Sequence, residues 1–114
     1  MKPLAKHALP PKVRRSLQKL GEDLRTARLR RNITVASIAE RAGISPGTVL
    51  RLEHGDPGVG MGTLFLVMWL LGLNDRMMQL ADETQDRLGL TLEAEQRRKR
   101  ARKIVFKVRA HHEK

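Results

Sequence analysis

Apolar residues recur at helical spacing through the first quarter of the chain. Between about residues 13 and 31 they fall at every third or fourth position, with charged residues between them, at Leu17, Leu20, Leu24 and Ala27. Such a stripe is typical of an amphipathic helix that turns one face toward a core. The pattern therefore predicts a first helix over about 13–31.

Two shorter helices follow, each preceded by a hydroxyl residue and followed by a glycine. Thr34 and Ser45 stand at N-cap positions, and Gly43 ends the first of the two helices in the left-handed conformation. Pro46 occupies the first helical position, where its missing amide costs nothing. The predicted helices are 35–42 and 46–54, and their inward faces consist of Ile38, Ala39, Ala42, Val49 and Leu52.

The second half of the chain is less regular. Residues 55–62 carry four glycines and a proline and must form a loop, whereas 62–71 is apolar nearly all round and predicts a fourth helix. Asn74 or Asp75 caps a fifth short helix that extends to about Leu80. Beyond it lie a polar stretch, the basic tract 97–103 and a β-prone run, 104–108, which either adds a strand to a partner chain or stays disordered.

These elements predict an all-α protein. We expect a five-helix domain over 13–81, a flexible basic arm over 1–12 and a basic C-terminal tail over 82–114. Only three aromatic residues occur in the 114-residue chain, so the core consists mainly of aliphatic side chains and Met. Such a composition suits packed helices better than a sheet.

The formal net charge of +11 is concentrated at the two ends of the chain. Residues 17–92 hold nine basic and nine acidic groups, whereas 93–114 hold nine basic and three acidic groups. An excess of this size favours a polyanionic partner, nucleic acid first and an anionic membrane surface second. The chain has no cysteine, no signal peptide and no apolar run of the roughly 20 residues that span a bilayer, so we expect a cytoplasmic protein without a membrane partner.

The most specific constellation is the spacing inside 35–54. Two short helices pack at a steep angle only if the contact residue on the first is small and the turn accepts a positive φ. Ala39, Gly43, Val49 and Leu52 supply these properties at separations of four, six and three residues. A helical hairpin with a glycine turn is the plainer interpretation, but the caps, the turn, the core positions and the basic surplus together favour a helix-turn-helix that reads DNA.

The stretch LGEDLRTARLRRNITVASIAERAGISPGTVLRLEHG resembles the lambda-repressor-like helix-turn-helix domain, also called the Xre family, and the resemblance covers about residues 17–81. Within that superfamily, DPGVGMGTLFLVMWLLGL and ADETQDRLG are similar to the HipB-like antitoxins. Members of that group repress their own operons as dimers and bind a HipA-like kinase. Many members of the family carry Gln where Val35 stands here, so a contact made by that side chain is not available to this chain.

The resemblance assigns DNA contacts residue by residue. Base edges in the major groove would be met by Ser45, Pro46, Gly47, Thr48 and Arg51. Pro46 and Gly47 have no side-chain donor, so reading falls mainly on Thr48 and Arg51, whose guanidinium matches O6 and N7 of guanine. The alternative for Arg51 is a surface ion pair, and for Thr34 and Ser45 it is plain helix capping.

We expect phosphate contacts from the start of the second helix, from the end of the third and from the basic tract, namely from Thr34, Val35, His54, Arg97, Arg98, Lys99 and Arg100. The tract is otherwise a solvated tail. The resemblance also implies a structural ion pair between Arg28 and Glu53. The surplus of apolar side chains at 62–71 predicts a dimer interface at Phe65, Trp69 and Leu70, the alternative being a monomer whose tail covers them.

Other chemistry finds little support in the sequence. GVGMG lacks the strand and the lysine of a nucleotide-binding loop, the four histidines are scattered or terminal, and the methionines suit a core. We therefore expect no catalytic residue, no metal site and no cofactor.

The resulting hypothesis is a homodimeric repressor on a pseudo-palindromic operator in double-stranded DNA, acting as the antitoxin of a HipA-like kinase. Two alternatives remain at this point. The first is a stand-alone Xre-type or phage-type repressor without a toxin partner, and the second is an adaptor whose basic ends bind acidic lipid or RNA.

Overall fold

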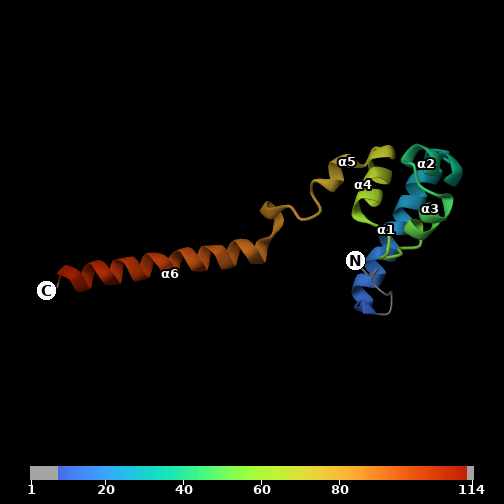
Figure 1. The fold of residues 1–114 in the computed structure, drawn as a ribbon. Helices are drawn as coiled ribbons and strands as arrows, with labels where there is room; N and C mark the ends of the chain where they lie inside the picture. Colours follow the sequence, from blue (N-terminus) through green and yellow to red (C-terminus); the bar gives the residue numbers. More distant parts are fainter. Residues whose placement is uncertain (1–7, 113–114) are drawn as a thin grey trace. The chain divides into compact units, whose positions relative to one another are not determined.

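The computed structural model describes residues 8–112, and every regular element in that part of the chain is a helix. The order is α1 (Pro11–Arg30), α2 (Val35–Ala42), α3 (Pro46–Glu53), α4 (Met61–Leu70), α5 (Asn74–Met77), the 3-10 helix η2 (Glu83–Gln85) and α6 (Arg87–His112), as drawn in Figure 1. The all-α prediction is confirmed. The chain divides into two compact units, residues up to Met77 and residues from Met78 onward.

The first unit is built around one core to which four helices contribute. Helix α3 packs against α1 and α2, and α4 packs against α2. The buried apolar side chains are those that the helical spacing predicts for α1 to α3, joined by others from α4 and its C-terminal end: Leu24, Ala27, Ile38, Ala39, Val49, Leu52, Val67, Met68 and Leu71. The core is therefore aliphatic, apart from one methionine, and holds no buried aromatic ring.

Both short helices have the caps that the sequence predicts. The Thr34 hydroxyl accepts a hydrogen bond from the Ser37 amide at 3.0 Å, and the Ser45 hydroxyl accepts one from the Thr48 amide at 3.1 Å. Gly43 ends α2 at a φ of 67°, in the left-handed region. These local bonds satisfy amides that a helix leaves unpaired at its N-terminus, so α2 and α3 can be short and still well defined.

Helix α1 approaches the end of α3 more closely than any side chain would permit. A Cβ atom added at Gly21 would lie 2.7 Å from the carbonyl carbon of Glu53 and 2.8 Å from the carbonyl oxygen of Leu52. Gly55, at a φ of 77°, meets the backbone of Leu17 in the same way, at 2.7 Å. The two glycines thus allow backbone to pack directly on backbone where α1 crosses the end of α3.

Helix α4 buries only one of its apolar faces. Val67, Met68 and the following Leu71 enter the core, with Leu64 partly buried beside them. Trp69 lies on the other side and keeps 59% of its surface exposed. The predicted fifth helix is too long by three residues, because α5 ends at Met77 and the next apolar side chains find no core to enter.

The C-terminal region differs most from the prediction. The sequence predicts a tail over 82–114, with 104–108 as a strand or disordered, but α6 runs through 104–108 as part of a 26-residue helix. The Asp86 carboxylate accepts a hydrogen bond from the Gly89 amide at 2.9 Å and so caps its first turn. The Leu, Glu, Ala, Gln, Arg and Lys residues of 87–103 all favour a helix, and no strand exists in the described residues with which a β-prone run could pair. The prediction of five helices therefore misses α6.

The predicted arm, 1–12, falls mostly on residues 1–7, which lie outside the described residues. Its last two residues belong to α1, which begins at Pro11 and not near Val13. In the part of the chain that the structure covers, no helix is both long enough and apolar enough to cross a membrane.

The close approach at Gly21 leads to a paired prediction. We expect Gly21→Ala to lower the free energy of unfolding by roughly 1–3 kcal/mol, because the added methyl group overlaps the backbone of α3. Gly62→Ala is the matched control, since a Cβ there meets nothing within 4 Å and the residue lies inside α4. The control should be neutral or stabilising by up to about 1 kcal/mol. Urea unfolding of both variants measures the difference, and equal midpoints would contradict the packing argument.

Candidate nucleic-acid interface

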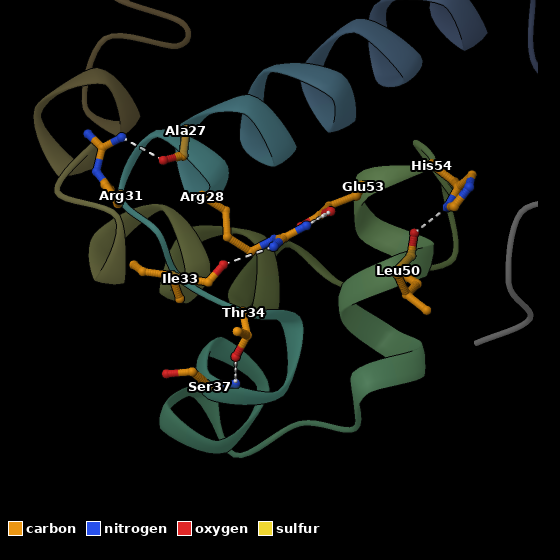
Figure 2. Close-up of polar contacts among 9 residues, drawn as sticks. All are labelled: Ala27, Arg28, Arg31, Ile33, Thr34, Ser37, Leu50, Glu53 and His54. Carbon is orange, nitrogen blue, oxygen red and sulfur yellow. Dashed lines mark hydrogen bonds and ion pairs between the residues drawn. The ribbon is translucent and has the colours of Figure 1, made fainter.

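A buried ion pair joins α1 to α3. Arg28 donates from Nε to Oε2 of Glu53 at 2.8 Å and from Nη2 to Oε1 at 3.0 Å, and the two residues are only 6% and 8% exposed. The third donor, Nη1, reaches the Ile33 carbonyl at 2.9 Å, as Figure 2 shows. From α1, the Arg28 side chain thus holds two other segments, namely α3 and the connection between α1 and α2.

The ion pair also shifts the pKa of Arg28. The hydrogen bonds to Glu53 raise the pKa of Arg28, the negative charge of that carboxylate acts in the same direction, and burial opposes both. The guanidinium therefore stays charged at any pH at which proteins are handled. No buried side-chain nitrogen or oxygen in the described residues lacks a partner. The pair is thus fully satisfied, which is the condition under which buried charges are tolerated.

Helix α3 also presents a face to solvent. Val49, Leu52 and Glu53 are buried, whereas Pro46, Gly47, Leu50, Arg51 and His54 are exposed. These five residues follow one another at helical spacing, so they line one side of α3. The described side chains on this face can make hydrogen bonds, through Arg51 and His54, and an apolar contact, through Leu50.

The residues expected at the start of α3 are joined to one another. Ser45 and Thr48 share a hydrogen bond between their hydroxyls at 2.9 Å, in addition to the N-cap bond. Ser45 is exposed and Thr48 is partly buried. Capping and a contact with DNA remain compatible here, because each hydroxyl oxygen has two acceptor lone pairs.

Arg51 and His54 each have a partner within the protein. Arg51 donates from Nε to Oδ2 of Asp56 at 3.0 Å, and Nδ1 of His54 lies 2.6 Å from the Leu50 carbonyl. Figure 2 shows the histidine folded back over the last turn of α3. The surface ion pair, which was the alternative for Arg51, is therefore present.

At the start of α2, the Thr34 hydroxyl caps the helix while Thr34 itself stays exposed (Figure 2). Val35 is partly buried and packs against the core, so only its backbone amide is suited to bind a phosphate. The other predicted phosphate contacts, Arg97, Arg98, Lys99 and Arg100, are exposed on α6. Arg97 lies 3.5 Å from Glu93, one turn earlier, in a pair that is open to solvent.

The three predicted interface residues lie together on α4. Trp69 is exposed, and Phe65 and Leu70 are each partly buried. Leu66 and Met61 add further exposed apolar surface on the same helix. Within the described residues, no group of three His, Asp or Glu side chains is arranged to hold a metal ion.

Sequence reasoning missed three residues that shape this surface. Gly21 gave no signal because a glycine inside a helical pattern is tolerated without a special role. Leu50 falls outside the stripe formed by Val49 and Leu52, so its exposure follows from that spacing. Asp56 belongs to a loop, and its contact with Arg51 depends on the chain turning back after α3.

Two short capped helices, a left-handed turn between them and an exposed face on the second define a helix-turn-helix module, the class of domain that inserts its second helix into the major groove of DNA. A family model described as a helix-turn-helix domain matches residues 19–80, and the chain belongs to that family. The match confirms the broader part of the expected resemblance. Comparison with the curated proteins finds no match.

The buried pair gives a prediction about stability. Arg28→Ala removes one partner and leaves the Glu53 charge buried, which should cost about 3–5 kcal/mol in the free energy of unfolding. Arg25→Ala is the matched control, because Arg25 lies on the same helix one turn earlier and is exposed. The control should change stability by less than about 0.5 kcal/mol.

A double variant separates the pair from its surroundings. Arg28→Met combined with Glu53→Leu removes both charges, and we expect it to be more stable than Arg28→Ala alone. Thermal unfolding followed by circular dichroism provides the comparison. If Arg28→Ala and Arg25→Ala melted at the same temperature, the ion pair would not be the link that holds α1 to α3.

Proposed function

We propose that the protein is a sequence-specific DNA-binding repressor of transcription that acts as a homodimer on a pseudo-palindromic operator. The observation that carries this proposal is the exposed face of α3, which offers an arginine in the last turn of a short helix with a capped N-terminus. A helix of this size fits the major groove of B-DNA, where each base pair presents a distinct set of donors and acceptors. Membership of the helix-turn-helix domain family supports the same function.

Base reading rests mainly on Thr48 and Arg51 in this proposal. An arginine fork pairs with O6 and N7 of guanine, which is the commonest specific contact between proteins and DNA. Ser45, Pro46 and Gly47 bring the start of α3 close to the base edges without a bulky side chain in the way. Leu50 adds an apolar group on the same face, suited to the methyl group of thymine.

Phosphate contacts hold the module against the duplex. At the start of α2, the N-cap Thr34 and the first helical amide, that of Val35, lie at the end that carries the partial positive charge of the helix, which favours a phosphate there. His54 lies at the other end of the exposed α3 face. The four successive basic residues 97–100 of α6 would bind phosphates without regard to sequence.

The exposed part of α4 is the interface that we propose between two copies of the chain. Trp69, Phe65 and Leu70 offer a contiguous apolar surface on one helix, and tryptophan is among the residues most enriched at interface hot spots. A two-fold dimer brings two copies of α3 about 34 Å apart, one turn of B-DNA. The operator then has the two-fold symmetry of the protein.

The narrower proposal is that this repressor is the antitoxin of a HipA-like kinase and controls its own operon. It rests on the similarity of residues 56–73 and 81–89 to HipB-like antitoxins. The alternative is a stand-alone Xre-type or phage-type repressor. A HipA-like kinase encoded in the neighbouring reading frame, and its co-purification with this chain, would favour the antitoxin, and the absence of such a frame would favour the stand-alone repressor.

Substituting Arg51 should separate base reading from phosphate binding. We expect Arg51→Ala to weaken binding to a duplex selected from a random library by roughly 1–3 kcal/mol per half-site, with little effect on random DNA. Arg97→Ala with Arg98→Ala should instead weaken binding to both duplexes. The double substitution should also flatten the slope of log affinity against log salt by about 0.9 for each phosphate that the variant no longer neutralises.

Titration of each variant on both duplexes measures these effects. Equal losses for Arg51→Ala on selected and random DNA would make Arg51 a phosphate contact and would locate base reading elsewhere. An unchanged salt slope after the two α6 substitutions would remove α6 from the DNA interface. A wild-type protein that enriches no common sequence from the library would overturn the proposed function.

Substituting Trp69 tests the dimer. Trp69→Glu introduces a charge into the proposed interface, so we expect the variant to sediment as a monomer and to bind a two-half-site duplex at least tenfold more weakly than the wild-type protein does. Leu29→Glu is the control, because Leu29 is a similarly exposed apolar residue on α1. A wild-type protein that sediments as a monomer at micromolar concentration and on DNA would contradict the proposed interface.

A further inference from the structure

The geometry points to Asp56 as a positioning residue that holds Arg51 in the orientation needed to read a base. Asp56 follows α3 and opens the connection to α4, so it lies outside the recognition helix itself. The inference rests on the proposed function, because it assigns to Asp56 part of the sequence preference of the same surface.

Asp56 is tied to its surroundings at three atoms. Its Oδ2 accepts from Nε of Arg51 at 3.0 Å, and its Oδ1 accepts from the Gly58 amide at 2.8 Å. Its own amide donates to the Arg51 carbonyl at 3.0 Å. The Gly58 amide thus holds one oxygen of the carboxylate, and the Asp56 amide holds the residue to the end of α3, while the Arg51 side chain extends from the helix surface.

The two side chains of this ion pair differ in exposure, so one of them can hold the other in place. The Arg51 side chain is 54% exposed and the Asp56 side chain 25%. The aspartate therefore acts as a fixed support and the arginine as the group that it orients. The exposed pair Lys19–Asp23 on α1 lacks this asymmetry, since both of its side chains lie mostly in solvent at 2.7 Å from each other.

Beside DNA, an arginine that no other residue holds in place can bind a phosphate instead of a base. Its side chain loses rotamer freedom when it is fixed on a base, and phosphates outnumber suitable guanines along any duplex. A carboxylate on Nε restricts the rotation of the guanidinium plane before DNA arrives. End-on pairing with O6 and N7 of guanine uses the two terminal nitrogens, so a bond through Nε is compatible with reading.

The same carboxylate repels phosphate. Asp56 therefore lowers the affinity of this surface for DNA in general while it favours one orientation of Arg51. Removing its charge should leave affinity for random duplexes equal or raise it, and should reduce the preference for the selected duplex. A residue that only supported the fold would change both affinities in the same direction.

The experiment compares Asp56→Asn with the wild-type chain on a selected duplex and on a random duplex of equal length. Asparagine keeps an oxygen for the Gly58 amide but loses the charge. We expect the ratio of the two affinities to fall about fivefold or more, and affinity for the random duplex to stay equal or to rise. Asp23→Asn is the matched control, because it removes the same charge from an exposed ion pair on α1. The control should leave the ratio of the two affinities within twofold of the wild-type ratio.

A double-variant cycle excludes an indirect effect. In an Arg51→Ala background, Asp56→Asn should no longer change the ratio, since the group that it orients is gone. Asp56→Glu keeps the charge and moves it by one methylene, so it should lower the ratio less than Asp56→Asn does. Should Asp56→Asn melt well below the wild-type temperature, the glutamate variant takes its place in the cycle.

The outcomes separate this inference from the proposed function. Wild-type protein that selects no sequence overturns both. If the wild-type protein selects a sequence through Arg51 but Asp56→Asn has the same ratio of affinities for the selected and random duplexes, only the positioning role of Asp56 is overturned. An equal effect of Asp56→Asn with and without Arg51 also overturns it, because the aspartate would then act on DNA directly.

Discussion

The first unit depends on the ion pair between Arg28 and Glu53. It links the last turn of α1 to the last residue of α3, and the third donor of the arginine holds the connection between α1 and α2. A bidentate contact fixes an angle as well as a distance, because both the guanidinium and the carboxylate are planar. The exposed face of α3 is therefore oriented by a buried contact at the C-terminal end of that helix.

The backbone around this pair is built for close contact. Gly21 and Gly55 let α1 lie directly on the end of α3, where any larger residue would meet backbone atoms. The caps at Thr34 and Ser45 define where the short helices begin. The glycines and caps thus determine the position of α3, and the buried charges determine its orientation.

The sequence predicts most of the first unit because its signals are local. Caps, a turn glycine and apolar spacing act within a few residues, and α2 begins and ends where they indicate. The contact between Arg51 and Asp56 could not be predicted in this way, since it depends on the path of a glycine-rich loop. Helix α6 was missed for another reason. Its β-prone run 104–108 favours a strand locally, but the cap at Asp86 and the helix-forming residues before that run extend the helix through it.

The charge distribution of α6 bears on which part of the chain could distinguish one DNA sequence from another. It carries nine basic and two acidic residues over 26 positions, and four successive basic residues at 97–100 surround its axis, since each residue turns the helix by about 100°. A rod that is positive on every side presents much the same charge after any rotation about its axis. Such a helix has no preferred register on a polyanion. Under the proposed function, discrimination among DNA sequences then belongs to the first unit, and contacts from α6 would change only how long the chain stays on a duplex and how far it travels along it.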